Sequence, residues 1–214
     1  MRGYLNFKML LIANFKNYKK GKNALKLAKL IQKYNKQALV GVQFQDIKLV
    51  SSNTNLKVYS QQLTKEFNAK KVKFLGAHGT FLNHSAYKLG LNDIKKLNNK
   101  SKQAGLKVIV FAANLNEVKQ IKKLKPNYIA YEDPKLIGTG KSITKYKGKN
   151  VEKFVRLLKG TKIIPVCGAG ISSIDDVKQA KKLGCKGVAI ASAIANVKEK
   201  EAEEFLKEIK SFNE

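Results

Sequence analysis

Two hydrophobic patterns alternate along the chain from Met9 to its C-terminus. Short apolar runs, four to seven residues long, occur eight times, and the stretches between them carry apolar residues at three- and four-residue spacing among lysines. The short runs are typical of buried strands, whereas the wider spacing indicates amphipathic helices, with Ala24, Leu27, Ala28 and Ile31 as one buried face. The predicted strands cover residues 9–13, 38–44, 56–60, 79–82, 106–112, 127–131, 162–166 and 186–191.

This alternation predicts an α/β fold with a parallel sheet. A tight hairpin cannot join parallel strands, so each connection must cross over through a helix. A closed (β/α)8 barrel and an open doubly wound sheet both satisfy this rule. The open sheet of a dinucleotide-binding protein would carry G-x-G-x-x-G after its first strand, where Asn14, Phe15 and Lys16 stand instead. Polar and glycine residues gather after the strands, which favours the barrel.

Length and composition favour a single domain. The chain has 214 residues, 43% of them hydrophobic, and no linker-like segment or change of composition divides it. We expect residues 9–214 to form a catalytic barrel and residues 1–8 to be an N-terminal extension. The apolar run at residues 9–13 is too short for a membrane span or a signal peptide, which predicts a cytoplasmic protein with no membrane partner.

The net charge of +28 raises nucleic acid or an acidic membrane as a partner. Nearly all of this charge is lysine, because Arg2 and Arg156 are the only arginines, whereas nucleic-acid readers use arginine forks for phosphates and bases. The lysines are also spread over every helix-like stretch. We therefore interpret them as solvated outer faces, favoured by an AT-rich coding sequence, and expect no specific nucleic-acid partner. The positive field would still attract a small anionic substrate.

The two cysteines carry no recognisable chemistry. Cys167 and Cys185 match no zinc or redox spacing, and neither has a histidine close by in sequence. We expect them to be buried, reduced thiols, and we expect neither a metal nor a cofactor.

Residues able to bind anions and move protons follow the predicted strands. These segments are Asn14-Phe15-Lys16 after the first strand, Asn83-His84-Ser85 after the fourth, Glu132-Asp133-Pro134 and Ile137-Gly138-Thr139-Gly140 after the sixth, Gly168-Ala169-Gly170 after the seventh, and Ala191-Ser192 after the eighth. The carboxyl ends of barrel strands share one mouth, so all of these segments should meet there.

Some of these residues also have a purely structural interpretation. His84 alone could be a satisfied core histidine, as we assume for His78, and most lysines of this chain are surface lysines. Lys16 differs because it ends a buried strand, where its ammonium needs an anion or a carboxylate. Glu132 is costly at the rim of a core unless it is paired or used.

The glycine-rich segments indicate anion binding. Residues 137–140 could form an ordinary turn, but glycines beside Pro134 suit a lid whose backbone N–H groups reach an anion. Residues 168–170 precede a helix that should begin near Ile174, and free amides at a helix N-terminus favour phosphate. A base, an electrophile, an ammonium and a phosphate cradle are the parts needed for proton abstraction next to a carbonyl: Glu132 takes the proton while the enediolate oxygen is stabilised by other groups.

The same motifs resemble the triosephosphate isomerase family in its short archaeal form. Asn-x-Lys, Asn83-His84-Ser85, Glu132 with Pro134 and residues 136–140, and residues 167–171 occur in the family's order, from about Met9 to the C-terminus. The resemblance implies a TIM barrel. It also implies an aldose–ketose isomerase of glycolysis and gluconeogenesis that interconverts dihydroxyacetone phosphate and D-glyceraldehyde 3-phosphate through an enediolate.

Roles follow from the resemblance by position. Glu132 would be the base, and His84 a neutral electrophile at the start of a helix whose N-terminus disfavours its protonated form. Lys16 would offset negative charge, and Asn14 would hold the oxygen side of the site. The implied substrate-binding residues are Asn14, Phe15, Lys16, Ile137, Gly138, Gly170, Ala191 and Ser192, with a short helix after the eighth strand directed at the phosphate.

Three features depart from the family pattern. Ala86 stands where a glutamate usually follows the His-Ser pair, which removes a carboxylate from the neighbourhood of Lys16. The stretch from Gln61 to Asn83 is shorter by roughly one loop, and the missing part resembles the third loop that docks beside the neighbouring subunit's site. This disfavours the usual dimer and predicts a monomer or an atypical oligomer. Ala193 replaces a more usual glycine, which predicts a weaker grip on the phosphate.

Two alternatives stay open at the level of the sequence. One is a barrel enzyme acting on another phosphorylated substrate, and the other is a catalytically impaired barrel that still binds phosphate. Retention of Glu132, His84, Lys16 and the lid argues against a loss of catalysis. The second Asn-x-Lys motif, at residues 6–8, has no strand before it, and we interpret it as a coincidence.

Overall fold

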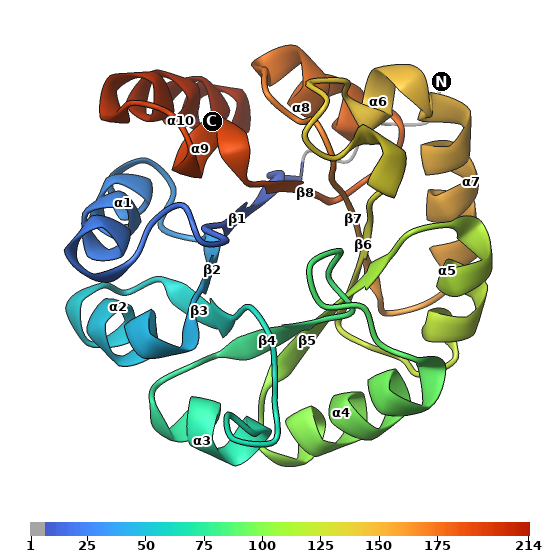
Figure 1. Ribbon diagram of the computed structural model, residues 1–214. Helices are drawn as coiled ribbons and strands as arrows, with labels where there is room; N and C mark the ends of the chain where they lie inside the picture. The colour runs from blue at the N-terminus through green and yellow to red at the C-terminus, as the bar shows by residue number, and fades with distance from the viewer. Residues whose placement is uncertain (1–6) are drawn as a thin grey trace.

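A closed barrel of eight parallel strands forms the centre of the molecule, as the computed structural model of residues 7–214 shows (Figure 1). Each strand pairs with the next in chain order, and β8 returns to β1 with Val188 opposite Leu11. The strands are β1 (Leu10–Asn14), β2 (Leu39–Val42), β3 (Lys57–Ser60), β4 (Gly79–Leu82), β5 (Lys107–Ala112), β6 (Tyr128–Tyr131), β7 (Ile164–Cys167) and β8 (Gly187–Ile190). The predicted (β/α)8 barrel is confirmed.

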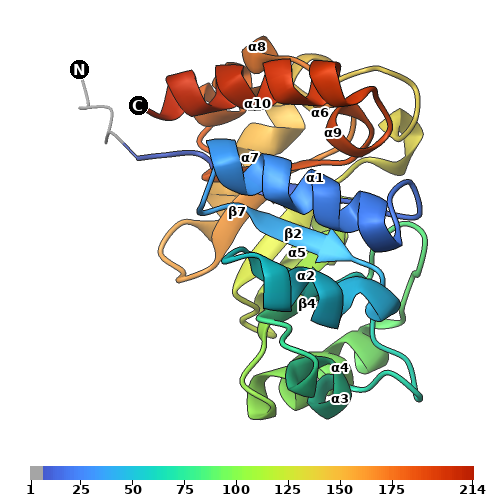
Figure 2. The ribbon, with the colours of Figure 1, turned by 90° about the vertical axis from the view of Figure 1, so that its left-hand side faces the viewer.

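Helices surround the barrel and connect its strands. Figure 2 shows α10, α1 and α2 side by side along one flank, and helices α1 and α10 pack directly on each other. The α-helices are α1 (Gly21–Tyr34), α2 (Ile47–Asn53), α3 (Ala69–Phe74), α4 (Leu91–Gln103), α5 (Leu115–Lys122), α6 (Ile143–Tyr146), α7 (Gly148–Leu158), α8 (Ile174–Lys182), α9 (Ser192–Ala195) and α10 (Glu199–Asn213). Two 3-10 helices, η1 (Phe44–Asp46) and η2 (Pro134–Leu136), follow β2 and β6. No helix of residues 7–214 is long and apolar enough to cross a membrane.

The core has two layers because every strand is covered on both faces. Inside the barrel, Ile12, Tyr59, Phe81, Ile109 and Phe111 belong to one buried cluster. A larger cluster fills the space between the strands and the helices, and the predicted face of α1 is buried there. Side chains of successive strand residues point to opposite faces, so a strand buried on both faces appears as an unbroken apolar run.

The strand boundaries differ from the predicted ones by a few residues. The second strand ends at Val42 and not at Phe44, because Gln43 precedes the 3-10 helix η1. The seventh strand begins at Ile164 and not at Lys162, since the amide of Ile164 is the first to bond across to β6, at the carbonyl of Asn127. The predicted N-terminal extension lies mostly outside the described residues. Of it, Phe7 packs against the core.

Candidate active site

The predicted strand-end residues meet at the mouth of the barrel. Residues from the loops after β1, β6, β7 and β8 line one small cavity. Of the predicted site residues, those lining it are Asn14, Lys16, Glu132, Ile137, Gly138, Gly170, Ala191 and Ser192. His84 lies beside this cavity with Nε2 3.9 Å from Oε2 of Glu132. The side chain of Phe15 is fully buried in the core and does not reach the cavity.

Glu132 follows β6 directly, and its side chain is only 13% exposed. Burial raises the pKa of its carboxyl to about 7, although the charges of Lys16 and Lys88 act in the opposite direction. Gly168 makes room for this side chain, because a Cβ at Gly168 would lie 2.6 Å from Oε1 of Glu132. A carboxylate of this basicity, beside a cavity, is suited to accept a proton near neutral pH.

His84 is buried and packs edge-on against the ring of Phe111, with ring centroids 4.9 Å apart. The backbone N–H of Ala86 donates to Nδ1 at 3.3 Å, and Nε2 lies 3.2 Å from Nδ2 of Asn14 on the side that faces Glu132. Burial, together with the charges of Lys16 and Lys88, lowers the pKa of His84 to about 4. The ring is therefore neutral at pH 7.

The expected helix at His84 is wrong. Residues 84–90 form turns and irregular backbone, and helix α4 begins only at Leu91. The neutral state of His84 therefore comes from burial and from two neighbouring lysines, and not from a helix N-terminus. The Asn83 backbone has φ +58°, which directs the chain into these turns immediately after β4.

Hydrogen bonds to its backbone hold Lys16 in place. Its carbonyl accepts hydrogen bonds from the side-chain amides of Gln43, at 3.0 Å, and Gln61, at 2.9 Å, and its N–H donates to Oδ1 of Asn14 at 3.0 Å. These contacts support a backbone with φ +46°. Among residues 7–214 no carboxylate lies within 4 Å of its ammonium, and Lys16 lines the cavity. The group is therefore available to an anion in the cavity.

The lid and the loop after β7 form the opposite wall. Asp133 caps η2 by accepting from the amide of Lys135, and the amide of Ile137 donates to the carbonyl of Pro134. The N–H groups of Gly138 and Gly170 have no acceptor among residues 7–214. Both glycines have positive φ, and both line the cavity. Two amides without a protein acceptor, on residues that line one cavity, favour an anionic group there.

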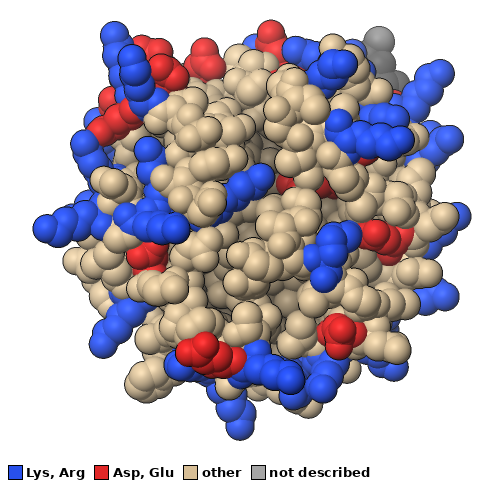
Figure 3. Space-filling view, in the orientation of Figure 1, with Lys and Arg blue, Asp and Glu red and all other residues tan. Residues whose placement is uncertain are grey.

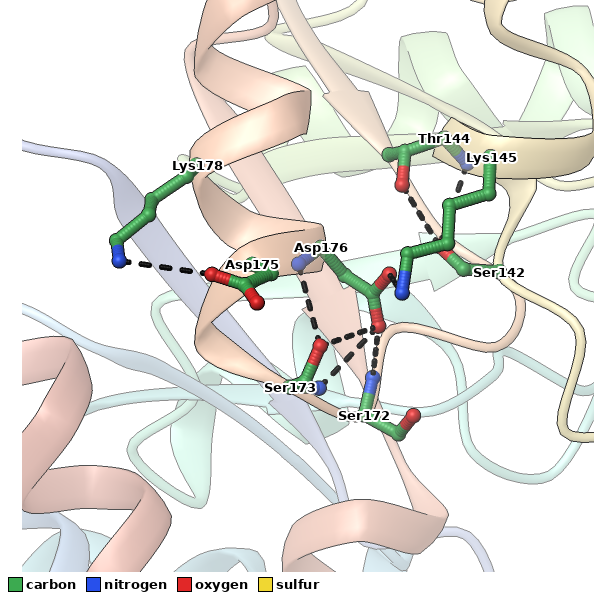
Figure 4. A network of polar contacts seen from close by, with 8 residues as sticks. All are labelled: Ser142, Thr144, Lys145, Ser172, Ser173, Asp175, Asp176 and Lys178. Carbon is green, nitrogen blue, oxygen red and sulfur yellow. Dashed lines mark hydrogen bonds and ion pairs between the residues drawn. The ribbon is translucent and has the colours of Figure 1, made fainter.

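The lid rejoins the barrel next to Gly170. A Cβ at Gly170 would lie 2.1 Å from the carbonyl oxygen of Lys141, so glycine is needed for this approach. The amide of Ile143 donates to the carbonyl of Ala169 at 3.1 Å. Beyond it, Lys145 of α6 reaches Oδ1 of Asp176 in α8 at 3.4 Å (Figure 4). The end of the lid and the loop after β7 are thus joined.

The remaining sequence features take no part in this site. Cys167 and Cys185 are free and buried, as expected, and a hydrogen bond with Cys167 together with burial raises the pKa of Cys185. Residues 7–214 contain no group of three or more metal-ligating side chains. Lysines and arginines lie over the periphery of the face in Figure 3, interspersed with acidic residues and not gathered in one patch.

Several contributors were missed by sequence reasoning. Gln43 and Gln61 hold Lys16, Lys88 lowers the pKa of both His84 and Glu132, and Gly168 makes room for Glu132. Gln61 and Gly168 follow predicted strands, so their positions in the sequence indicate a place at the barrel mouth. Nothing in the sequence distinguishes Lys88 from the other lysines of this lysine-rich chain.

A neutral histidine, a basic carboxylate, a free ammonium and unpaired amides around one barrel mouth define an acid–base catalyst for a small anionic substrate. The triosephosphate isomerase family model matches residues 9–211. The triosephosphate isomerase of Methanocaldococcus jannaschii is 38% identical, with 95% of this chain and 100% of the relative covered, and that of Methanothermus fervidus is 35% identical, with 94% and 98% covered. The chain belongs to the triosephosphate isomerase family.

Solved structures agree on the fold. Triosephosphate isomerase from Bartonella henselae has a TM-score of 0.72 at 16% identity, covering 95% of this chain and 98% of that chain. The tryptophan synthase α-subunit from Pyrococcus furiosus reaches 0.70 at 15% identity, covering 95% and 96%. Two different enzymes match the barrel almost equally well, so the fold alone does not identify the reaction.

Proposed function

We propose that this protein interconverts dihydroxyacetone phosphate and D-glyceraldehyde 3-phosphate. The observation that carries the proposal is the pairing of Glu132 with His84 across 3.9 Å, at the edge of a cavity that Lys16 also lines. Membership of the triosephosphate isomerase family supports the same substrate. We further propose that residues 9–214 constitute the catalytic domain.

Glu132 would remove a proton from the carbon next to the substrate carbonyl and return it to the neighbouring carbon. A pKa of about 7 makes its carboxylate basic enough to accept the proton and acidic enough to release it. His84, neutral and protonated on Nε2, would donate a hydrogen bond to the oxygen on which negative charge develops. Lys16 would stabilise that charge and the substrate phosphate, and Asn14 would hold the backbone of Lys16.

The phosphate would lie between the lid and the loops after β7 and β8. Unpaired amides at Gly138 and Gly170 support this assignment, and Ala191 and Ser192 line the same cavity. The side chain of Phe15 would contribute only as core packing beneath Asn14 and Lys16. Because Ile137 and Gly138 of the lid line the cavity, movement of the lid would complete or open the phosphate site.

A monomer, or an oligomer built on another surface than the third loop, is the proposed assembly. The segment between β3 and α3 folds back onto its own chain, since Phe67 stacks on Phe44 with ring centroids 3.5 Å apart. Lys71 lies above both rings, at 5.1 and 5.5 Å. Sedimentation equilibrium separates the two, since a monomer has a mass of about 24 kDa. A dimer docked through residues 61–68 would contradict the proposal.

The activity can be tested in both directions with coupled assays. Wild-type protein should turn over both triose phosphates, whereas Glu132→Gln should reduce kcat at least about a thousandfold, because the base is lost. Glu208→Gln, on the exposed face of α10, is the matched control and should leave kcat unchanged. Equal, negligible turnover of wild type and Glu132→Gln would refute the proposed function.

A further inference from the structure

A second cavity, of about 130 Å³, lies behind the proposed catalytic base. Glu132 lines both this cavity and the one that would hold the substrate. Its walls are largely apolar, with Phe111 and Pro134 among them, and Lys88 is the cation that lines it. Lys16 lines the first cavity and Lys88 the second, so a carboxylate between them needs something to keep it directed at the substrate.

Glu117, in the first turn of α5, reaches the same place from outside. Its Oε2 accepts from the N–H of Ala113 at 2.9 Å and lies 3.3 Å from Nδ2 of Asn83. Nζ of Lys88 lies 3.2 Å from Oε2 and 3.5 Å from Oε1. One carboxylate therefore joins the loop after β4 to the loop after β5 and also neutralises Lys88.

The groups that Glu117 holds are those that position His84. Asn83 immediately precedes His84 and has φ +58°, a conformation that its side chain supports. Its Nδ2 donates to the carbonyl of Phe111 at 2.8 Å, and its Oδ1 accepts from the amide of Leu89 at 2.9 Å. The ring of Phe111 packs on His84. Loss of Glu117 would loosen one side of this arrangement.

Lys88 acts on both proposed catalytic groups through its charge. It lowers the pKa of Glu132 and that of His84. The side chain of Lys88 is 44% exposed and that of Glu117 is 29% exposed, so the pair itself adds little stability. The ion pair matters because it fixes the position of the Lys88 ammonium. Without Glu117, Lys88 could attract the carboxylate of Glu132 into the second cavity.

We propose that Glu117 is a positioning residue of the active site, which holds Asn83 and engages Lys88 so that Glu132 stays directed at the substrate. The inference rests on the proposed isomerase activity for its kinetic consequences. The charged and titratable groups that face Glu132 are Lys16 from the loop after β1 and His84 and Lys88 from the loop after β4. Asp133, next in the chain, lies 3.8 Å from Lys147.

Glu117→Gln tests this role because glutamine keeps an acceptor for Ala113 but loses the charge that holds Lys88. We expect kcat to fall about tenfold, a size typical of coupling between contacting groups, with a smaller change in KM, since the phosphate lies on the other side of Glu132. The acid limb of the kcat profile should move to lower pH, because an unpaired Lys88 stabilises the ionised form of Glu132.

A second substitution separates positioning from a merely structural effect. Lys88→Met added to Glu117→Gln should restore kcat to within about threefold of wild type and move the acid limb back to higher pH. Glu152→Gln, which removes an exposed charge from α7, is the control and should change neither quantity. A Glu117→Gln profile that superimposes on the wild type, or a double variant no better than Glu117→Gln, would overturn the proposal.

A readout without turnover keeps this inference separate from the proposed function. The chain has two histidines, so ¹⁵N NMR resolves His84. Its pKa of about 4 should fall in Glu117→Gln and rise in Lys88→Met. If the titration midpoint of His84 is unchanged in both variants, the inference is refuted even if the enzyme is active. An inactive wild type with both shifts present would refute the function and support the inference.

Discussion

Glu132 and Asp176 are both buried carboxylates near the mouth of the barrel, yet their environments differ. The Glu132 side chain is 13% exposed, and its closest described ionisable partner is the neutral His84, at 3.9 Å. The Asp176 side chain is 2% exposed and accepts from the amides of Ser172 and Ser173 and from the Ser173 hydroxyl, at 3.0–3.2 Å (Figure 4). Burial raises the pKa of Glu132 to about 7. Burial also opposes ionisation of Asp176, but hydrogen bonds from Ser172, Ser142 and Ser173 leave its pKa below the ordinary value.

The difference shows that hydrogen-bond donors, and not burial, separate the lowered pKa of Asp176 from the raised pKa of Glu132, the proposed base. Asp176 completes a capping box with Ser173 at the start of α8 through Oδ2, and its Oδ1 lies 3.4 Å from Nζ of Lys145, so hydrogen bonds and an ion pair stabilise its charge. Glu132 has no such donors among residues 7–214, so its charge is unfavourable and its proton affinity is high. The three predictions below test this contrast.

Glu132→Gln should stabilise the protein at pH 8, by up to about 3 kcal/mol. The folded pKa of about 7 exceeds the ordinary value of 4.5, so the folded state binds more protons than the unfolded state between these pH values. The wild type therefore loses stability at Glu132 as the pH rises through this window, whereas the variant does not, because glutamine does not ionise. Urea unfolding of both proteins at pH 5 and pH 8 measures the difference in their free energies of unfolding.

The free energies of unfolding of the two proteins must be compared with each other at each pH, because the pH dependence of either protein alone has a second source. The lowered pKa of His84 acts in the opposite sense, because the folded state then binds fewer protons between about 4 and 6.5. Subtracting the wild-type free energy of unfolding from that of Glu132→Gln at each pH cancels the contribution of His84. A difference that does not grow between pH 5 and pH 8 would contradict the assignment of a raised pKa to Glu132.

Asp176→Ala should lower the free energy of unfolding by about 2 kcal/mol at pH 7, since it leaves two backbone amides and a hydroxyl without their acceptor and removes the cap of α8. The folded pKa of Asp176 is depressed, so this stability is present above the ordinary value of 3.8 and is lost as the pH falls through the lower folded value. Asp175→Ala is the matched control, because Asp175 is exposed and its one ion pair within residues 7–214 is with Lys178, at 3.5 Å. Its effect should stay below about 0.5 kcal/mol. Equal losses for the two variants would refute the structural role of Asp176.

The sequence predicted the barrel and the residues that end its strands. Eight apolar runs with helical stretches between them leave few alternatives, and Glu132, His84 and Lys16 are unusual residue types at their positions. Contacts between elements distant in sequence could not be predicted in this way. Glu117 meets Asn83 across 34 positions, and only its place in the first turn of a helix, after the cap Asn114, is visible locally. The protonation state of His84 could not be predicted either, because it depends on packing against Phe111 and on the charges of Lys16 and Lys88.

Gly168→Ala should disturb Glu132 while leaving Asp176 intact, and it is the smallest effect expected. The added Cβ would lie 2.6 Å from Oε1 and 2.9 Å from Cγ of Glu132, so the flexible side chain must shift by a few tenths of an ångström or more. We expect kcat to fall about tenfold, because a displaced base misses its proton-transfer geometry, with little change in the free energy of unfolding. Gly148→Ala, whose Cβ would make only an ordinary contact of 3.8 Å with Leu183, is the control and should keep wild-type kcat. A Gly168→Ala enzyme with wild-type kcat would mean that Glu132 tolerates displacement, and that its basicity matters more than its position.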